Sequence, residues 1–145
     1  MLSRVVAFDS IGFLLLSDNG SSVQLIAFDR SPEAHEVEIG TQVPHAGSAV
    51  GRAIDEQKPI YVPDTQTELS RIPELASQAR LGSPHSAYIF PISTSGKKLG
   101  ALAFEIVNGG QFNPDDMELM TSVSSHVAVA LESAIATDAA ERYQR

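Results

Sequence analysis

Two β-rich runs joined by a short polar segment constrain the fold of this chain more than any other feature of its sequence. Residues 10–16 and 22–28 flank Ser17-Asp18-Asn19-Gly20. Asn-Gly is the favoured pair for a type I′ turn, in which both central residues have positive φ, and this turn joins antiparallel neighbours. The sequence therefore predicts an antiparallel sheet that begins with a hairpin.

A second hairpin is predicted late in the chain. Residues 86–92 and 99–107 are β-rich and are separated by the turn segment 93–98. Pro91 within the first run predicts a bulge or an edge position, because proline cannot donate a ladder hydrogen bond. Residues 35–42 and 60–62 are further strand candidates. We therefore expect an α+β fold with about five to six antiparallel strands.

Between the hairpins, residues 47–56 have the apolar spacing of a helix that contains two glycines, Gly47 and Gly51. A glycine in mid-helix costs about 1 kcal/mol relative to alanine. Close packing of the helix on a sheet would compensate for this cost. Asp64 then follows the short strand, Thr65 to Glu68 matches a capping box, and Ser70 is a candidate N-cap for a short helix over residues 73–79.

The chain is predicted to end in one long helix. Asn113 is the expected N-cap, Pro114 takes the first helical position, and Asp115 and Asp116 place negative charge in the first turn. Apolar residues then recur at helical spacing, namely Met120, Val123, Val127, Ala130 and Ala134. No glycine stop precedes the mixed-charge tail. We expect this helix to continue into another part of a larger protein.

Composition excludes several classes of protein. The 145 residues suit one domain, and they include no cysteine, which rules out disulfides, thiolate metal sites and cysteine catalysis. The net charge is −8 and the bases are scattered, so direct nucleic-acid binding is not expected. Neither a membrane span nor a secretory signal is visible in the sequence, and we expect a cytoplasmic chain.

Four segments together resemble the GAF domain, a small-molecule sensory and dimerisation module of signalling proteins. These segments are VVAFDSIGFLLL (5–16), GSAVGRAIDEQKPIYVPD (47–64), HSAYIFPISTSGKKLGALAFE (85–105) and FNPDDMELMTSVSSHVAVAL (112–131). The resemblance is greatest to the sensors of sigma-54-dependent transcriptional activators and of sensor histidine kinases. It implies one GAF domain over residues 1–145, with a sensor body (1–113) and a C-terminal signalling helix (114–145). The usual first helix is missing, so we expect a fragment whose effector domain lies outside it.

The resemblance also implies a ligand pocket between the sheet and the segment that links the helix to the later strands. The candidate residues there are polar or aromatic: His45, Tyr61, Asp64, Arg80, His85 and Tyr88, with Arg71 beside them. Each has a structural alternative. Asp64 in a turn more often caps backbone N–H groups, the arginines suit a solvated face, and the tyrosines suit a core. The ligand is not identified, and no cofactor is predicted.

Other activities have weaker support in the sequence. A metal site at His45, Asp64 and His85 would lack the cysteine of iron-containing GAF sensors. Gly47-Ser48 offers amides to a phosphate, but the phosphodiesterase GAF motif for cyclic nucleotides is absent. GAF-fold methionine sulfoxide reductases use cysteine, and neighbouring residues of a strand, such as His85 and Ser86, point to opposite faces. We therefore expect no enzyme activity and no bound metal.

The alternative to a ligand sensor is a ligand-free dimerisation module. The apolar stripe of the last helix, from Met120 to Ala134, has coiled-coil character. It could equally cover the domain's own sheet. In that arrangement a neighbouring stripe formed by Leu119, Val129 and Ala136 would contact a second copy and form a homodimer.

Overall fold

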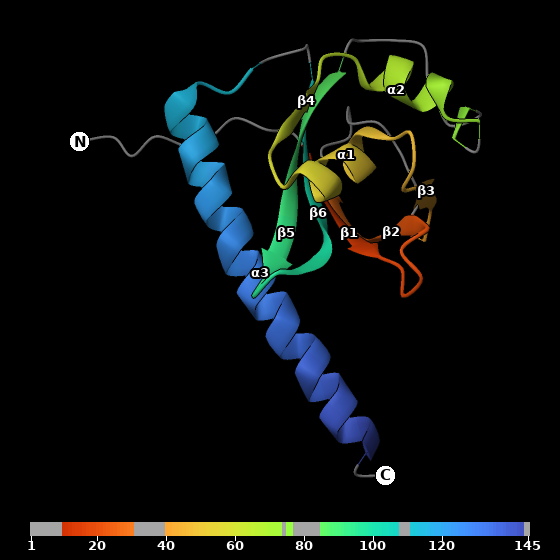
Figure 1. The fold of residues 1–145 in the computed structure, drawn as a ribbon. Helices are drawn as coiled ribbons and strands as arrows, with labels where there is room; N and C mark the ends of the chain where they lie inside the picture. Colours follow the sequence, from red (N-terminus) through yellow and green to blue (C-terminus); the bar gives the residue numbers. More distant parts are fainter. Residues whose placement is uncertain (1–9, 31–39, 74, 77–84, 108–110, 144–145) are drawn as a thin grey trace.

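The computed structural model describes residues 10–30, 40–73, 75–76, 85–107 and 111–143. Its six strands form one antiparallel sheet with the order β3-β2-β1-β6-β5-β4 (Figure 1). The strands are β1 (Ser10–Leu16), β2 (Ser22–Arg30), β3 (Gln42–Pro44), β4 (Ile60–Val62), β5 (His85–Thr94) and β6 (Lys97–Val107). This sheet confirms the predicted α+β class, its antiparallel strands and both hairpins.

Helices cover both faces of the sheet. The long helix α3 (Pro114–Tyr143) lies along one face, and α1 (Ala49–Glu56) and α2 (Thr65–Arg71) lie on the other (Figure 1). Side chains of β5 alternate between the two layers: Ala87 and Ile89 join the core under α1 and α2, whereas Tyr88 and Phe90 join the core under α3. The period of two in the strand therefore builds two separate cores on one sheet.

The turn chemistry predicted for the first hairpin occurs in the second. Ser95 and Gly96 have φ of 48° and 79° and form the two-residue loop between β5 and β6, as a type I′ turn requires. Gly20 also has positive φ, but Asn19 does not. The Asn19 side chain instead accepts hydrogen bonds from Ser17 and Ser21, which stabilise a longer loop. The prediction of a type I′ turn at Asn19-Gly20 was wrong for this reason.

Pro91 takes the predicted edge position. It pairs with Ala101 of β6 on one side. The short strand β4 ends its pairing with β5 at Ile89, so on the other side Pro91 lies past the end of β4. A register shift follows between Ile92 and Ser93. The missing proline N–H is therefore tolerated because no neighbouring strand needs it there.

The two glycines of the first helix serve different purposes. Ser48 is the N-cap of α1 and its Oγ accepts from the Gly51 N–H, so Gly47 precedes the helix, with φ of 80°. Gly51 is helical, and a Cβ there would lie 1.7 Å from the carbonyl oxygen of His45. The expected close approach exists, but the nearest atoms belong to the chain just after β3 rather than to the sheet's core strands.

The predicted N-cap at Ser70 was wrong, and the predicted strand 35–42 and helix 73–79 lie mostly outside the described residues. The third strand is β3 at Gln42–Pro44, and most of the predicted range 35–42 lies outside the described residues. The helix after β4 begins at Thr65 with Asp64 as its N-cap and ends at Arg71, so Ser70 lies inside it. The Asp64 carboxylate reaches the amides of Gln66 and Thr67 and therefore starts the helix earlier than Ser70 would.

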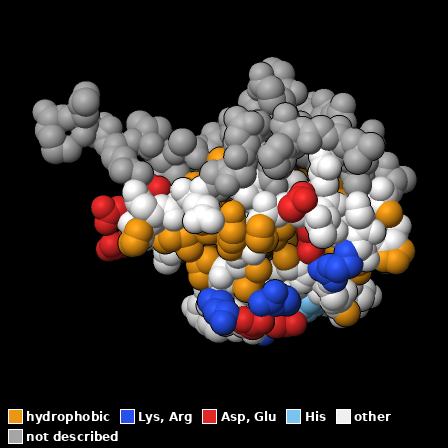
Figure 2. Space-filling model, turned by 90° about the horizontal axis from the view of Figure 1, so that it is seen from above, with side chains coloured by type: hydrophobic (Ala, Val, Ile, Leu, Met, Phe, Trp, Pro, Cys, Tyr) orange, Lys and Arg blue, Asp and Glu red, His pale blue; other side chains and the backbone are white. Residues whose placement is uncertain are grey.

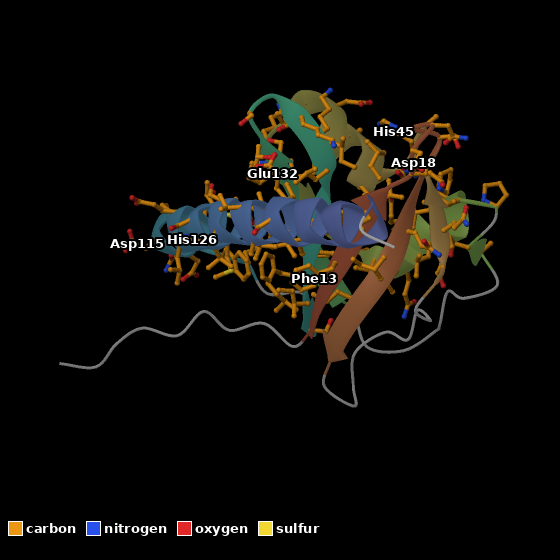
Figure 3. All side chains as sticks on the ribbon, turned by 90° about the horizontal axis from the view of Figure 1, so that it is seen from below. Phe13, Asp18, His45, Asp115, His126 and Glu132 are labelled. Atoms are coloured by element: carbon orange, nitrogen blue, oxygen red, sulfur yellow. The ribbon has the colours of Figure 1, made fainter. Side chains whose placement is uncertain are left out.

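The long helix begins as predicted. Asn113 Oδ1 accepts from the Asp116 N–H at 2.8 Å, and Asp116 Oδ2 accepts from the Asn113 N–H at 3.0 Å. Its covered face comprises Met117, Met120, Val123, Val127, Ala128 and Leu131, which pack on the sheet together with Phe13 of β1 (Figure 3). Ala130 and Ala134 are exposed, so the part of the predicted stripe that covers the sheet ends before Ala130. The C-terminal part of α3 extends past the sheet (Figure 1).

Candidate functional site

An apolar cavity of about 120 Å³ lies between the sheet and the helices α1 and α2. Strands β1, β2, β3, β4, β5 and β6 all contribute to its wall. Its apolar lining consists of Gly12, Leu14, Leu25, Val43, Val50, Val62, Leu69, Ile72, Leu75, Ala87, Ile89 and Ala103. Most of these residues lie on the sheet face that α1 and α2 cover, and the others come from α1, α2 and the residues just after α2, so the cavity is a gap in the core between them. Its composition suits an apolar guest.

Three polar side chains also line the cavity: Thr65, Glu68 and Glu105. Thr65 is the first residue of α2 and Glu68 lies one turn later, so both project from the same side of the helix. The Thr65 Oγ1 is buried and has no hydrogen-bond partner among the described residues. Glu105 comes from β6, and its carboxylate accepts a long bond of 3.4 Å from the Ser10 hydroxyl.

Glu68 and Arg71 hold α2 over the cavity by binding the start of α1. Glu68 Oε2 accepts from the Ala49 N–H at 2.8 Å, and Arg71 donates to the Gly47 carbonyl oxygen at 2.8 Å. The two side chains also form an ion pair at 2.6 Å. The carboxylate of Glu68 therefore caps a backbone amide at the N-terminus of α1, where negative charge is favourable. This arrangement joins the two helices that form one side of the cavity.

A more open groove of about 350 Å³ lies next to the cavity, between α1, β4 and α2. Its lining includes Tyr61 and Asp64, two of the predicted ligand residues, and also Arg71 and Arg52. From above, charged side chains gather at one edge of the molecule beside a band of hydrophobic ones (Figure 2). Both carboxylate oxygens of Asp64 accept hydrogen bonds from Gln66 and Thr67. The capping role, predicted as the alternative to ligand binding, is therefore present.

The other predicted residues do not meet at the cavity. Tyr88 lies on the α3 side of the sheet, where its ring stacks on Phe112 at 4.5 Å and its hydroxyl accepts from the Phe112 N–H at 3.1 Å. Tyr61 packs against Tyr88 on that same side, with ring centroids 4.8 Å apart. Arg80 and the side chain of His85 lie outside the described residues. The ligand-binding role of these residues stays a prediction.

His45 lies just before α1 and links three parts of the chain. Its Nδ1–H donates to the Gly20 carbonyl oxygen at 2.7 Å, and its Nε2–H donates to Asp55 Oδ1 at 2.8 Å. Both partners are acceptors, so the charged imidazolium satisfies both contacts. The Gly20 bond is the largest cause that raises the pKa of His45 above 6.5; burial opposes it, and the hydrogen bond and charge of Asp55 raise the pKa further. Figure 3 shows His45 beside the Asp18 loop and away from α3.

Sequence reasoning missed the residues that line the cavity. Glu105 could have been found from the sequence. Alternate residues of a strand face the same side of a sheet, so Glu105 is a charged residue on the same face as the small apolar residues Ala101 and Ala103. Thr65 carried only the weak signal of a β-branched residue directly after a helix cap. Which apolar residues surround a gap depends on how α2 lies on the sheet, and no pattern within one element shows that.

Two kinds of feature are absent from the described part of the chain. None of its helices combines the length and apolarity needed for a membrane span. The described histidine, aspartate and glutamate side chains form no group of three that could hold a metal ion.

A six-stranded antiparallel sheet with a helix pair over an apolar cavity on one face and a long C-terminal helix on the other defines an α+β fold. The family model of the GAF domain matches residues 1–132. The chain therefore belongs to the GAF domain family.

Solved structures support this assignment at the level of the fold. The GAF domain of a two-component sensor histidine kinase from Bacillus halodurans is 22% identical, with a TM-score of 0.67 over 97% of this chain and 88% of that one. The second GAF domain of DevS from Mycobacterium smegmatis is 18% identical, with a TM-score of 0.68 over 95% and 87%.

An enzyme also shares the fold. A free methionine-R-sulfoxide reductase from Neisseria meningitidis, solved with its substrate, is 17% identical, with a TM-score of 0.65 over 90% of this chain and 71% of that one. A search of curated proteins found no match. At these identities the likeness concerns the fold alone.

Proposed function

We propose that this GAF domain is a non-catalytic sensor that binds a small molecule in the cavity and relays binding through α3 to an effector domain of a larger signalling protein. The observation that carries the proposal is the cavity itself, an apolar gap in the core lined by a buried hydroxyl that has no partner among the described residues. Such a hydroxyl costs stability in the empty protein, and a ligand can recover that cost.

The relay would run through β5. Ala87 and Ile89 line the cavity, and the alternating residues Tyr88 and Phe90 contact the core under α3. Tyr88 also holds the residue that precedes the helix cap, through the Phe112 amide. A ligand that shifts β5 would change how α3 packs on the sheet. The shift of the equilibrium between the two positions of α3 cannot exceed the difference in the ligand's binding free energy for them.

The setting of the module is proposed from the family. We propose a cytoplasmic homodimer within a bacterial signalling protein, either a sigma-54-dependent transcriptional activator or a sensor histidine kinase. No direct contact with nucleic acid or membrane is proposed. We also propose no reductase activity, because the chain has no cysteine.

The test uses xenon as a probe that needs only an accessible apolar cavity, since cavities of this kind bind it. We expect xenon to shift NMR signals of cavity methyl groups such as those of Val62 and Leu14, and to shift amide signals of α3 as well. Ala103→Leu fills the cavity and should abolish both effects, whereas Ala130→Leu on the exposed side of α3 should not. Cavity shifts without any response in α3 would contradict the relay, and no cavity shifts would contradict the sensor.

The second candidate function is the ligand-free dimerisation module. It is favoured by the exposure of Leu119 (45%) and Val129 (63%) on α3, which are large apolar side chains outside the covered face. Native mass spectrometry of the purified protein separates the two functions. A dimer that carries no bound molecule and does not respond to xenon would favour the module without a ligand.

A further inference from the structure

We propose that the cavity takes a small, neutral, mainly apolar molecule with one hydroxyl group, and that Thr65 Oγ1 is the hydrogen-bond partner of that hydroxyl. This inference rests on the proposed function, because it names the class of ligand for the same cavity. It goes further by predicting which molecules the cavity accepts and which it rejects.

The size and lining of the cavity set the bulk of the guest. Its volume of about 120 Å³ is close to that of an apolar protein cavity, about 150 Å³, that stays dry and binds benzene. Twelve of its fifteen described lining residues carry no polar side chain. A guest the size of one six-membered ring fits this space, and a nucleotide does not.

Thr65 supplies the one unused hydrogen-bonding group. Thr65 is only 6% exposed, and its Oγ1 has no hydrogen-bond partner among the described residues. Thr67, two residues later, shows the contrast: its hydroxyl donates to Asp64 at 2.9 Å. A hydroxyl can both donate and accept, so a ligand hydroxyl can pair with Thr65 in either direction. Burial of a hydroxyl without a partner is rare, because the unpaired group costs free energy that a hydrogen-bonding guest would recover.

The charges at the wall exclude an anion. Glu68 and Glu105 both line the cavity, and none of its described lining residues is lysine, arginine or histidine. Arg71 forms an ion pair with Glu68 and also donates to the Gly47 carbonyl oxygen, so its positive charge is already engaged. A carboxylate ligand would lie beside the Glu68 carboxylate with no lysine, arginine or histidine among the described lining residues to pair with it, which is strongly unfavourable. A neutral molecule avoids this cost.

Phenol, toluene and benzoate test the three proposed properties of the ligand, namely its size, its hydroxyl group and its lack of charge. NMR titration followed at the cavity methyl groups measures the Kd of each compound. Phenol and toluene are nearly the same size and differ in the hydroxyl, and phenol is neutral at pH 7 because such a hydroxyl has a pKa of about 10. Thr65→Val keeps the shape of the side chain and removes its hydroxyl. Thr65→Ser keeps the hydroxyl and serves as the matched control.

We expect wild type to bind phenol and not benzoate. In Thr65→Val the ratio of the phenol Kd to the toluene Kd should rise about tenfold, because a buried ligand hydroxyl then lacks its partner. In Thr65→Ser this ratio should stay close to the wild-type value. Thr65→Val should be at least as resistant to urea as wild type, since it removes an unsatisfied hydroxyl, so a folding defect is not expected to obscure the result.

Two outcomes overturn the inference and leave the proposed function standing: an unchanged phenol-to-toluene ratio in Thr65→Val, or binding of benzoate with an affinity equal to that of phenol. Failure of phenol and toluene alike, with xenon still bound, also overturns the proposed ligand class alone. Failure of xenon and of all three aromatic molecules overturns the inference together with the proposed sensor function.

Discussion

Gly51 shows how a single atom can decide whether a helix fits. A Cβ at this position would lie 1.7 Å from the His45 carbonyl oxygen, which is backbone and cannot move aside as a side chain could. We expect Gly51→Ala to lower the free energy of unfolding by about 1–3 kcal/mol, although alanine is the better helix former. Urea denaturation measures this change.

The matched control for Gly51→Ala is Gly47→Asn. Gly47 has φ of 80°, and a Cβ there would meet nothing within 4 Å. Asparagine adopts positive φ more readily than most residues, so this variant should lose less stability than Gly51→Ala. Equal losses of unfolding free energy in the two variants would contradict a specific clash between a Cβ at position 51 and the His45 carbonyl oxygen.

His45 makes the stability of the fold depend on pH. Its pKa is raised above 6.5 in the folded protein, mainly by the bond to the Gly20 carbonyl. Its contribution to stability is therefore fully present below the unfolded pKa and is lost as pH rises through the folded pKa. We expect the free energy of unfolding to fall over the upper part of the range from about pH 5 to 8.

The comparison for this prediction is His45→Gln, which has no titrating ring. The difference in unfolding free energy between wild type and His45→Gln should shrink as pH rises. Asp55→Asn should reduce the same dependence only in part, because the Gly20 bond remains and is the larger cause of the raised pKa. A difference that does not change with pH would show that His45 keeps its ordinary pKa.

At the scale of elements, α2 depends on its cap. Asp64 accepts from the amides of Gln66 and Thr67, so Asp64→Ala should lower the free energy of unfolding by about 1 kcal/mol. Asp64→Asn should restore most of that loss, because asparagine is an equally good N-cap. Urea denaturation of both variants checks the cap.

The same pair of variants separates the two roles predicted for Asp64. If the residue only caps α2, Asp64→Asn keeps both stability and affinity for phenol. An Asp64→Asn variant with wild-type stability and weakened binding would instead identify the carboxylate as a ligand contact, since the cap would be intact and only the charge would have changed.

β5 connects the two cores, and Tyr88 is its contact with the start of α3. Removing its hydroxyl leaves the buried Phe112 N–H without an acceptor. We expect Tyr88→Phe to cost about 1–3 kcal/mol and to speed hydrogen exchange around residues 112–116. Tyr61→Phe is the control, because the Tyr61 hydroxyl makes no hydrogen bond to the described residues. Equal exchange in the two variants would contradict a role for Tyr88 in seating α3.

At the scale of the whole molecule, α3 is longer than the sheet it covers. The Thr94 hydroxyl at the β5–β6 turn donates a hydrogen bond to Glu132, and the helix then runs on past the sheet (Figure 1). Leu119 and Val129 are exposed on the described part of this helix. We expect Val129→Glu to shift the proposed dimer toward monomer in light scattering at several concentrations, and Thr121→Glu, at an exposed position on a different face of the helix, to leave it unchanged. A wild-type monomer at every concentration would contradict the dimer.

Features decided within a few residues of chain were predictable. The Asn113 cap, the Pro114 start and the hairpin positions all depend on local bonding that the residue types reveal. Errors arose where two local signals competed. Asn19-Gly20 and Ser95-Gly96 both suit a tight turn, and only the pairing of the flanking strands decided which became the two-residue loop.

The sequence by itself determined the α+β class, the order of its elements, the family and the exclusion of cysteine chemistry, because these follow from periodicity, caps and composition. Only the tertiary structure decided the site. Tyr88 and Ile89 are neighbours in sequence, yet one contacts the core under α3 and the other lines the cavity. Thr65 became important because α2 lies over the sheet where no described group reaches its hydroxyl. A cavity is a property of how elements fail to fill the space between them, and no single segment of the chain carries that information.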